Sequence, residues 1–448
     1  MYVPNFEQWL EGGEDERIKV ELATNWSDDR LVPRLDSLLE FVRGAPLKPL
    51  PESSPRDNLF IRQIGALARI VDSNGRLRTG MRFPPVQTAD AKFDFLDSDC
   101  EAAWSITKLL NFLVISRIKP TRLAAVVATM RDDGVSMLEF IAHYITLGFD
   151  HIFIFSNDNS DGTTEMLELL SELGVITFIE NEVSIDISPQ RKAFEYSIHF
   201  LPQLRDYEWV FYADSDEFLL HAPKYDFNIA RIIEAVNESF PAERPSAICY
   251  SWKWFGGQSF RREEGLQLAK FEYSRRSIPV KSLVCLADVL TMRPLHFPIC
   301  KRPVVFVDSA LAPVSAAELN KRQLTYEGGK INHYWNKSFE EFAAKKLRGD
   351  SLEMSEGRNN EYKRVFDQFF AWNVPARPQY YDPCPQSVIS MVSSTREKLF
   401  ELTGVRVLHR EILKRFDDLL RPIGGPDGAR RIFEELALQY PDLTFEGH

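Results

Sequence analysis

Residues 123–155 read LAAVVATMRDDGVSMLEFIAHYITLGFDHIFIF. Residues 123–129 form an apolar run that is typical of a buried strand. Residues 136–147 carry apolar side chains at helical spacing, and Gly148 follows as a favourable C-cap. Residues 151–155 form a second apolar run. The stretch therefore predicts strand, helix and strand, which is a βαβ unit of a parallel sheet.

The same alternation continues to residue 213. Right-handed crossovers would place the carboxyl ends of these strands on one edge of the sheet, where α/β proteins bind ligands. We predict further helices at 163–173, 189–200, 394–402, 408–420 and 429–438, and further strands at 175–179, 209–213, 247–252 and 304–307.

The length of 448 residues suggests two or three domains. We expect an N-terminal α+β appendage at 1–120, with a hairpin at Asn74-Gly75, a central α/β domain at 121–349, and a mainly helical region at 350–448. Hydrophobic residues at 44% and charged residues at 27% exclude a mainly disordered chain.

A net charge of −11, without a long run of Lys and Arg, argues against nucleic acid as a partner. Five widely spaced cysteines argue against a disulfide framework and favour a reducing compartment. The N-terminus lacks the pattern of a signal peptide, and the longest apolar run, 109–115, is far shorter than the ~20 residues of a membrane helix. We expect a cytoplasmic protein, with peripheral contact at the inner face of a membrane and oligomeric contacts left open.

Asp214, Asp216 and Glu217 directly follow the strand predicted at 209–213. Carboxylates held this close repel one another unless a cation lies between them. Oxygen ligands of this kind suit Mg²⁺ or Mn²⁺. The alternative is a solvated acidic turn.

The segment 156–163, SNDNSDGT, follows another predicted strand and leads into a helix. At that place a nucleotide base or phosphate would dock. A calcium loop of the EF-hand kind is a competing interpretation, with Asn157, Asn159, Asp161, Gly162 and Glu168 at its ligand spacing. The Asn at its first position and the preceding strand argue against it.

Four blocks together resemble bacterial glycosyltransferases of the family 2 type, in the branch related to the family 92 glycosyltransferases. They are VVATMRDDGVSMLEFIAHYITLGFDHIFIFSNDNSDGTTEML at 126–167, YEWVFYADSDEFL at 207–219, WKWFGG at 252–257 and INHYWNKS at 331–338. The resemblance covers residues 122–349, about half of the chain.

This resemblance implies a GT-A fold and sugar transfer from a nucleotide-diphosphate donor, with a UDP-sugar favoured, to a glycan acceptor. Asp214 and Asp216 would bind the donor ribose and Mn²⁺ or Mg²⁺, with His333 as a third metal ligand. Asn157 and Asp158 would lie near the base, and Arg131 near the nucleotide. We expect a hexosyltransferase of the inverting type that acts in bacterial surface polysaccharide synthesis.

The departing diphosphate needs positive charge, and Arg191, Lys192 and Lys281 are candidates to supply it, with solvated surface cations as the alternative. An inverting enzyme also needs an acid that deprotonates the acceptor hydroxyl. In some related transferases that acid directly follows the aromatic-glycine element, where this chain has Gln258. The remaining candidates are Glu217, Glu263, Glu264 and Asp186.

Trp252, Trp254 and Phe255 precede Gly256-Gly257 and are candidates for stacking on an acceptor sugar, with glycines that admit close approach. A Trp-rich end of a core strand is the alternative. His143 is expected to have a structural partner.

Two other functions remain open. Because Gln258 stands where some related transferases have the acid, a non-catalytic GT-A-like module that binds a glycan or a partner is one alternative. A sugar nucleotidyltransferase is disfavoured, because residues 130–134 contain one glycine and two acids instead of a Gly-rich phosphate loop.

Overall fold

The computed structural model describes residues 81–83, 120–181, 188–292, 295–300, 305–348, 362–373, 379–441 and 443. The hairpin predicted at Asn74-Gly75 and the base candidate Asp186 lie outside these residues. Within the predicted N-terminal appendage, strand β1 (Met81–Phe83) is described and pairs in parallel with β4 (Thr177–Asn181).

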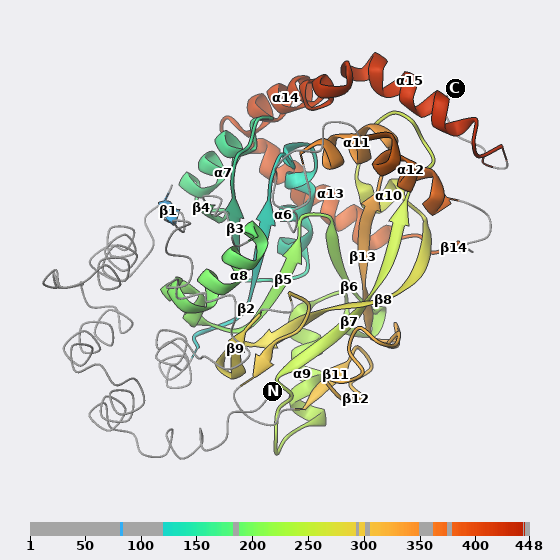
Figure 1. Ribbon diagram of the computed structural model, residues 1–448. Coiled ribbons are helices and arrows are strands. Elements are labelled where there is room, and N and C mark those ends of the chain that lie inside the picture. The colour runs from blue at the N-terminus through green and yellow to red at the C-terminus, as the bar shows by residue number, and fades with distance from the viewer. Residues whose placement is uncertain are drawn as a thin grey trace, which may run out of the picture.

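Within the described residues, a 12-stranded sheet forms the centre of the molecule (Figure 1). Its first part is parallel, in the order β4-β3-β2-β5, and its strands alternate along the chain with three helices. The α/β fold class, with the mainly parallel core that the resemblance implied, is thereby confirmed. The bounds are β2 (Arg122–Met130), α6 (Gly134–Thr146), β3 (His151–Ser156), α7 (Thr163–Glu172), α8 (Pro189–Phe200) and β5 (Tyr207–Asp214).

The second part of the sheet contains strands that the sequence patterns did not predict. The long strand β8 (Tyr273–Cys285) runs antiparallel between β5 and β7 (Ala247–Gly256). Strand β13 (Gly329–Asn336) pairs in parallel with β7 and antiparallel with β6 (Glu217–His221). Strands β11 (Phe306–Asp308), β12 (Pro313–Val314) and β14 (Tyr380–Tyr381) complete this part, and helices α9 (Ile229–Ser239) and α10 (Gln267–Lys270) connect it. Strands β9 (Val289–Thr291) and β10 (Ile299–Cys300) form a separate two-stranded antiparallel sheet.

Helices α6 and α8 cover opposite faces of the parallel strands. Val126 of β2 and Phe211 of β5 belong to the core that includes Phe140 of α6. The next residue of β5, Tyr212, packs instead against Phe194 of α8, with ring centroids 4.9 Å apart. This alternation follows from the two-residue period of a strand, and each face of the sheet is buried against a helix.

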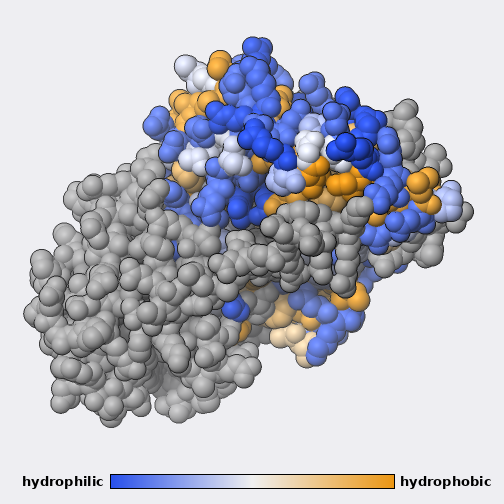
Figure 2. Space-filling model, turned by 45° about the horizontal axis from the view of Figure 1, so that its top comes forward, coloured by the Kyte–Doolittle hydropathy of each residue, from blue (hydrophilic) through white to orange (hydrophobic). Residues whose placement is uncertain are grey.

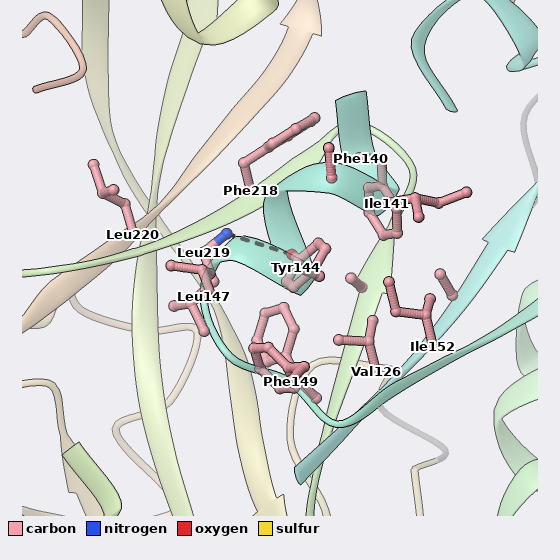
Figure 3. Packing of buried hydrophobic residues seen from close by; sticks show 14 of the residues in the cluster. Val126, Phe140, Ile141, Tyr144, Leu147, Phe149, Ile152, Phe218, Leu219 and Leu220 are labelled. Atoms are coloured by element: carbon pink, nitrogen blue, oxygen red, sulfur yellow. Dashed lines mark hydrogen bonds between the residues drawn. The ribbon is translucent and has the colours of Figure 1, made fainter. Parts of the chain in front are cut away.

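Helix α6 also holds strand β6 in place. The hydroxyl of Tyr144 donates to the carbonyl of Glu217 over 2.8 Å, and the backbone N–H of Leu219 donates weakly to the same hydroxyl (Figure 3). His143 donates from Nε2 to the carbonyl of Leu219 over 2.7 Å. The structural partner expected for His143 is therefore present, and these bonds position the strand that begins directly after the acidic turn.

The C-terminal helices pack on the α/β part. Helix α13 (Gln386–Glu401) contacts α6, and α14 (Val405–Arg415) contacts α6 and α7. Helices α11 (Phe339–Leu347), α12 (Tyr362–Asn373), η5 (Phe416–Ile423) and α15 (Gly425–Ala437) share a second, phenylalanine-rich core. The helices predicted at 394–402, 408–420 and 429–438 are thus present.

Hydrophilic side chains dominate the face that carries these C-terminal helices, with a narrower band of hydrophobic ones beside them (Figure 2). In the part of the chain that the structure describes, no helix combines the length and apolar character that crossing a membrane requires.

Close packing between β7 and β13 explains two glycines. A Cβ on Gly256 would lie 2.2 Å from the carbonyl oxygen of Asn336, and a Cβ on Gly257 would lie 2.8 Å from the ring of Phe271. The close approach that the sequence analysis assigned to an acceptor sugar is here an approach of the protein itself.

Buried histidines make the fold sensitive to acid. Burial lowers the pKa of His143 to about 4, whereas an unfolded chain has a histidine pKa of about 6.5. The unfolded state therefore takes up the proton first, so the contribution is complete above about pH 6.5 and is lost as the pH falls toward 4. We expect the free energy of unfolding to fall about 2 kcal/mol less between about pH 7.5 and 5 in His143→Gln than in wild type. Urea unfolding at both pH values measures this decrease in each protein, and equal decreases in His143→Gln and wild type would contradict the prediction.

Candidate active site

Three loops meet at the carboxyl edge of the parallel strands. Thr129 of β2 lies opposite Asp214 of β5, and Met130 lies opposite Ser156 of β3. This register ends the three strands at nearly the same level. The segments 131–133, 156–163 and 214–217 therefore lie side by side, as the sequence analysis expected.

Asp132 and Asp133 tie these loops together. The backbone N–H of Asp132 donates to Oδ1 of Asn159 over 2.8 Å, and its own Oδ1 accepts from the N–H of Ser160 over 2.6 Å. Oδ2 of Asp133 accepts from the hydroxyl of Ser215 over 2.6 Å. The sequence analysis did not single out either aspartate.

The carboxylate of Asp161 accepts the first backbone N–H of two helices, α6 and α7. Its Oδ2 accepts from the N–H of Gly134 over 3.0 Å and its Oδ1 from the N–H of Thr163 over 2.9 Å. Gly162 takes up a φ of +99° between them. These bonds, together with the one to Asn159, use oxygens that an EF-hand loop would need for calcium.

A buried lysine lies between two of the predicted carboxylates. Nζ of Lys281, on β8, lies 3.3 Å from Oδ2 of Asp214 and 3.3 Å from Oε2 of Glu217, and its side chain is only 1% exposed. Burial lowers the pKa of Lys281, but the two carboxylates outweigh it and raise that pKa above its ordinary value. Gln190 of α8 also donates to Asp214. The sequence analysis expected a cation between the clustered acids. Between Asp214 and Glu217, the ammonium group of Lys281 takes that place.

Asp216 is oriented the other way and contacts two cationic or basic groups. Its Oδ1 lies 3.4 Å from Nε2 of His333, and its Oδ2 lies 2.5 Å from Nζ of Lys345. Burial would raise the pKa of Asp216, but Lys345 and His333 lower it well below the ordinary value. The carboxylate is therefore ionised.

Strand pairing explains why Asp216 and His333 meet. His333 lies opposite Trp254 on one side and Glu217 on the other. The N–H of Tyr334 donates to the carbonyl of Asp216 over 2.8 Å. Inserting β13 between β6 and β7 thus brings a residue from late in the chain to the acidic turn.

Asp216 offers a carboxylate oxygen, the ligand type that Mg²⁺ and Mn²⁺ prefer, and His333 adds an imidazole nitrogen, a common ligand of transition metals. The third predicted ligand, Asp214, faces Lys281. Across the described ranges, no three His, Cys, Asp or Glu side chains gather closely enough to hold a metal. The pair fits one side of a metal site, and metal binding stays a prediction.

A cleft of about 440 Å³, counted with its open mouth, lies beside Asp216. Acids line one side and cations from the β13–α11 segment line the other. Arg348 lies 3.0 Å from Asp133, which mirrors the pairing of Lys345 with Asp216. The lining includes Asp132, Asp133, Asp216, Lys337, Lys345 and Arg348. The sequence analysis gave these three cations no role, although Lys337 lies within the block at 331–338 and Lys345 and Arg348 follow it.

A second groove, of about 310 Å³ with its opening, is lined by aromatic rings. Trp254 stacks on Trp335 at 5.7 Å and lies 3.9 Å from Trp372, between ring centroids. Of the predicted acceptor residues, Trp254 lines this groove and Trp252 packs against His333 at 4.4 Å. Phe255 also reaches the groove wall but is only 2% exposed.

The predicted nucleotide-binding residues Arg131 and Asn157 directly follow strands, whereas Arg191 lies on a helix. Arg131 follows β2, and its Nε is buried without a hydrogen-bond partner among the described residues. Asn157 follows β3 and donates to Asp158 over 3.3 Å. Arg191 lies in the first turn of α8, next to the residue that contacts Asp214. Lys192 is fully buried on the same helix, with its ammonium 5.4 Å from the ring centre of Tyr196.

The base candidates occupy different surroundings. Glu217 is fully buried, and burial together with Asp214 raises its pKa well above the ordinary value. Glu263 and Glu264 are exposed on the loop between β7 and α10.

Removing the buried ammonium should destabilise the fold. Lys281→Met leaves Asp214 and Glu217 without their shared counter-charge, so we expect the free energy of unfolding to fall by about 3–5 kcal/mol. Adding Glu217→Gln should recover part of this loss, because it removes a fully buried acid that has lost its lysine partner. Urea unfolding of both variants measures the effect, and a neutral Lys281→Met would show that the ion pairs do not stabilise the turn.

Residues 127–379, more than half of the chain, match the family described as glycosyltransferase family 92. No curated protein matches the chain significantly. Among solved structures, residues 1–349 of S. aureus TarS are similar with 11% identity and a TM-score of 0.25, covering 72% of this chain and 93% of that one. A longer S. aureus TarS structure has 12% identity and a TM-score of 0.25, covering 70% and 54%. An active-site mutant of LgtC has 13% identity and a TM-score of 0.23, covering 56% and 97%.

Proposed function

The chain belongs to glycosyltransferase family 92, and we propose that it transfers a sugar from a nucleotide-diphosphate donor, bound with Mn²⁺ or Mg²⁺, to a glycan acceptor. The contact between Asp216 and His333, at 3.4 Å beside the acid- and cation-lined cleft, carries this proposal.

The metal would be held by Asp216 and His333, with Asp214 as the predicted third ligand. A bound divalent ion supplies positive charge that stabilises the leaving diphosphate. In this arrangement the contact with Lys281 holds Asp214 in position.

The nucleoside would lie over the ends of β2 and β3, against Arg131, Asn157 and Asp158. Arg191 would contact the donor from the start of α8, where its neighbour Gln190 reaches Asp214. We favour a UDP-sugar as donor on the resemblance alone.

The acceptor would lie in the aromatic groove, where the partly exposed rings of Trp254, Trp335 and Trp372, packed on one another, form an apolar wall that suits the apolar face of a sugar ring. Trp252 packs on His333 and so connects this groove to the proposed metal site. For the inverting reaction, Glu263 and Glu264 are base candidates with access to solvent, whereas Glu217 is buried against Lys281.

The resemblance to bacterial transferases supports surface polysaccharide synthesis as the setting, on the cytoplasmic side of the membrane. A non-catalytic glycan-binding module is the second candidate, because Gln258 replaces the acid that some related transferases carry.

Nucleotide-dependent stabilisation tests the proposal. We expect one nucleotide among UDP, GDP, CMP and dTDP to raise the melting temperature only with Mn²⁺, since a ligand at 100 times its Kd adds about 2.7 kcal/mol. Asp216→Asn should remove this shift. Asp427→Asn, which makes the same charge change on exposed α15, should preserve it.

The outcomes separate the candidates. Stabilisation without Mn²⁺, or in Asp216→Asn, would overturn the metal assignment. Stabilisation by nucleotide together with no release of sugar from any donor, with or without added glycans, would favour the non-catalytic module.

A further inference from the structure

The Lys345 ammonium occupies one oxygen of the carboxylate that the proposed function assigns to a metal. His333 contacts Oδ1 of Asp216 at 3.4 Å, and Lys345 contacts Oδ2 at 2.5 Å. A divalent ion on Asp216 would therefore meet a positive charge already in place. Two cations this close repel each other, so the ion and the ammonium compete for the carboxylate.

The backbone of Lys345 is fixed, whereas its side chain reaches into the cleft. Helix α11 starts at a capping box between Ser338 and Glu341, and it buries Phe339 and Phe342 in the phenylalanine-rich core. The Lys345 side chain is 26% exposed and lines the cleft. Four methylenes give an ammonium group several ångströms of travel without any movement of the helix.

The cleft is charge-paired without a ligand. Lys345 pairs with Asp216, and Arg348 pairs with Asp133. A metal-bound diphosphate brings a divalent cation and an anion of similar charge together. If the cation takes the carboxylate, the ammonium that it displaces has a new anionic partner within the same cleft.

We propose that Lys345 is an exchangeable counter-ion, which neutralises Asp216 in the free protein and moves to the donor diphosphate when a divalent ion takes its place. This inference rests on the proposed function and adds a donor-binding residue to it. The exchange adds little net charge to the cleft, because the divalent ion and the anionic diphosphate offset each other, and it brings a second positive charge to the leaving group.

The exchange predicts that removing the Lys345 charge changes the affinities for Mn²⁺ and for nucleotide in opposite directions. In Lys345→Gln, Mn²⁺ alone should bind about tenfold more tightly, because the competing charge is gone. With Mn²⁺ saturating, UDP, GDP or dTDP, whichever stabilises wild type, should bind about tenfold more weakly, because the ammonium no longer reaches the diphosphate. Loss of the free Mn²⁺ spectrum in electron paramagnetic resonance measures the first, and calorimetry measures the second.

Two matched variants complete the test. Lys346→Gln changes the neighbouring lysine, which lies 4.8 Å above the ring of Trp335, and should resemble wild type in both titrations. If Lys345→Gln fails to fold, Lys345→Arg replaces it in the test. This variant keeps the charge and should retain nucleotide affinity within about threefold.

Both affinities unchanged in Lys345→Gln, or both shifted in the same direction, would overturn the exchange and leave the proposed function intact. Wild-type protein that binds neither Mn²⁺ nor any of the nucleotides would overturn the proposed function itself, and the exchange with it.

Discussion

The buried ammonium of Lys281, shared by Asp214 and Glu217, is the interaction on which the rest of the site depends. Glu217 is fully buried next to the partly exposed Asp214, and two acids this close need a positive charge beside them. That charge comes from β8, which must run antiparallel between β5 and β7 to deliver it. The charge balance of the turn therefore depends on the pairing of β8 with its neighbours. The other aspartate of the turn, Asp216, is directed into the cleft.

Around this turn the chain assembles two halves of a site. The parallel strands supply the loops at 131–133 and 156–163, whereas β7, β13 and α11 supply the histidine, the tryptophans and the cations. The halves are joined by backbone hydrogen bonding as well as by side chains, since the N–H of Tyr334 donates to the carbonyl of Asp216. A position set by a strand ladder is rigid, which suits residues that must hold charge at a defined distance.

The regular half of the fold could be predicted because its signals are local. Apolar runs mark the buried strands, and Gly148 and Gly174 end helices at φ values of +84° and +73°. Strand β8 reads YSRRSIPVKSLVC, and its charged residues conceal the fact that Lys281 is buried. For the site, Asp216 and His333 could be proposed from a resemblance, but Lys345 and Asp133 could not. Their partners lie 129 and 82 residues away along the chain, and tertiary packing alone selects them.

Asp216 is synthesised well before Lys345, because the two residues are far apart in the sequence. A ribosome adds about 5–20 residues per second. The 129 residues between the two side chains therefore take roughly 6–26 seconds to emerge. During that interval the nascent chain carries an acidic turn without its histidine or its lysine, and the parallel strands stand without β13. The cleft is completed only after α11 and η5 have been synthesised, so a growing chain that is still short of α11 has no assembled site to engage its ligands.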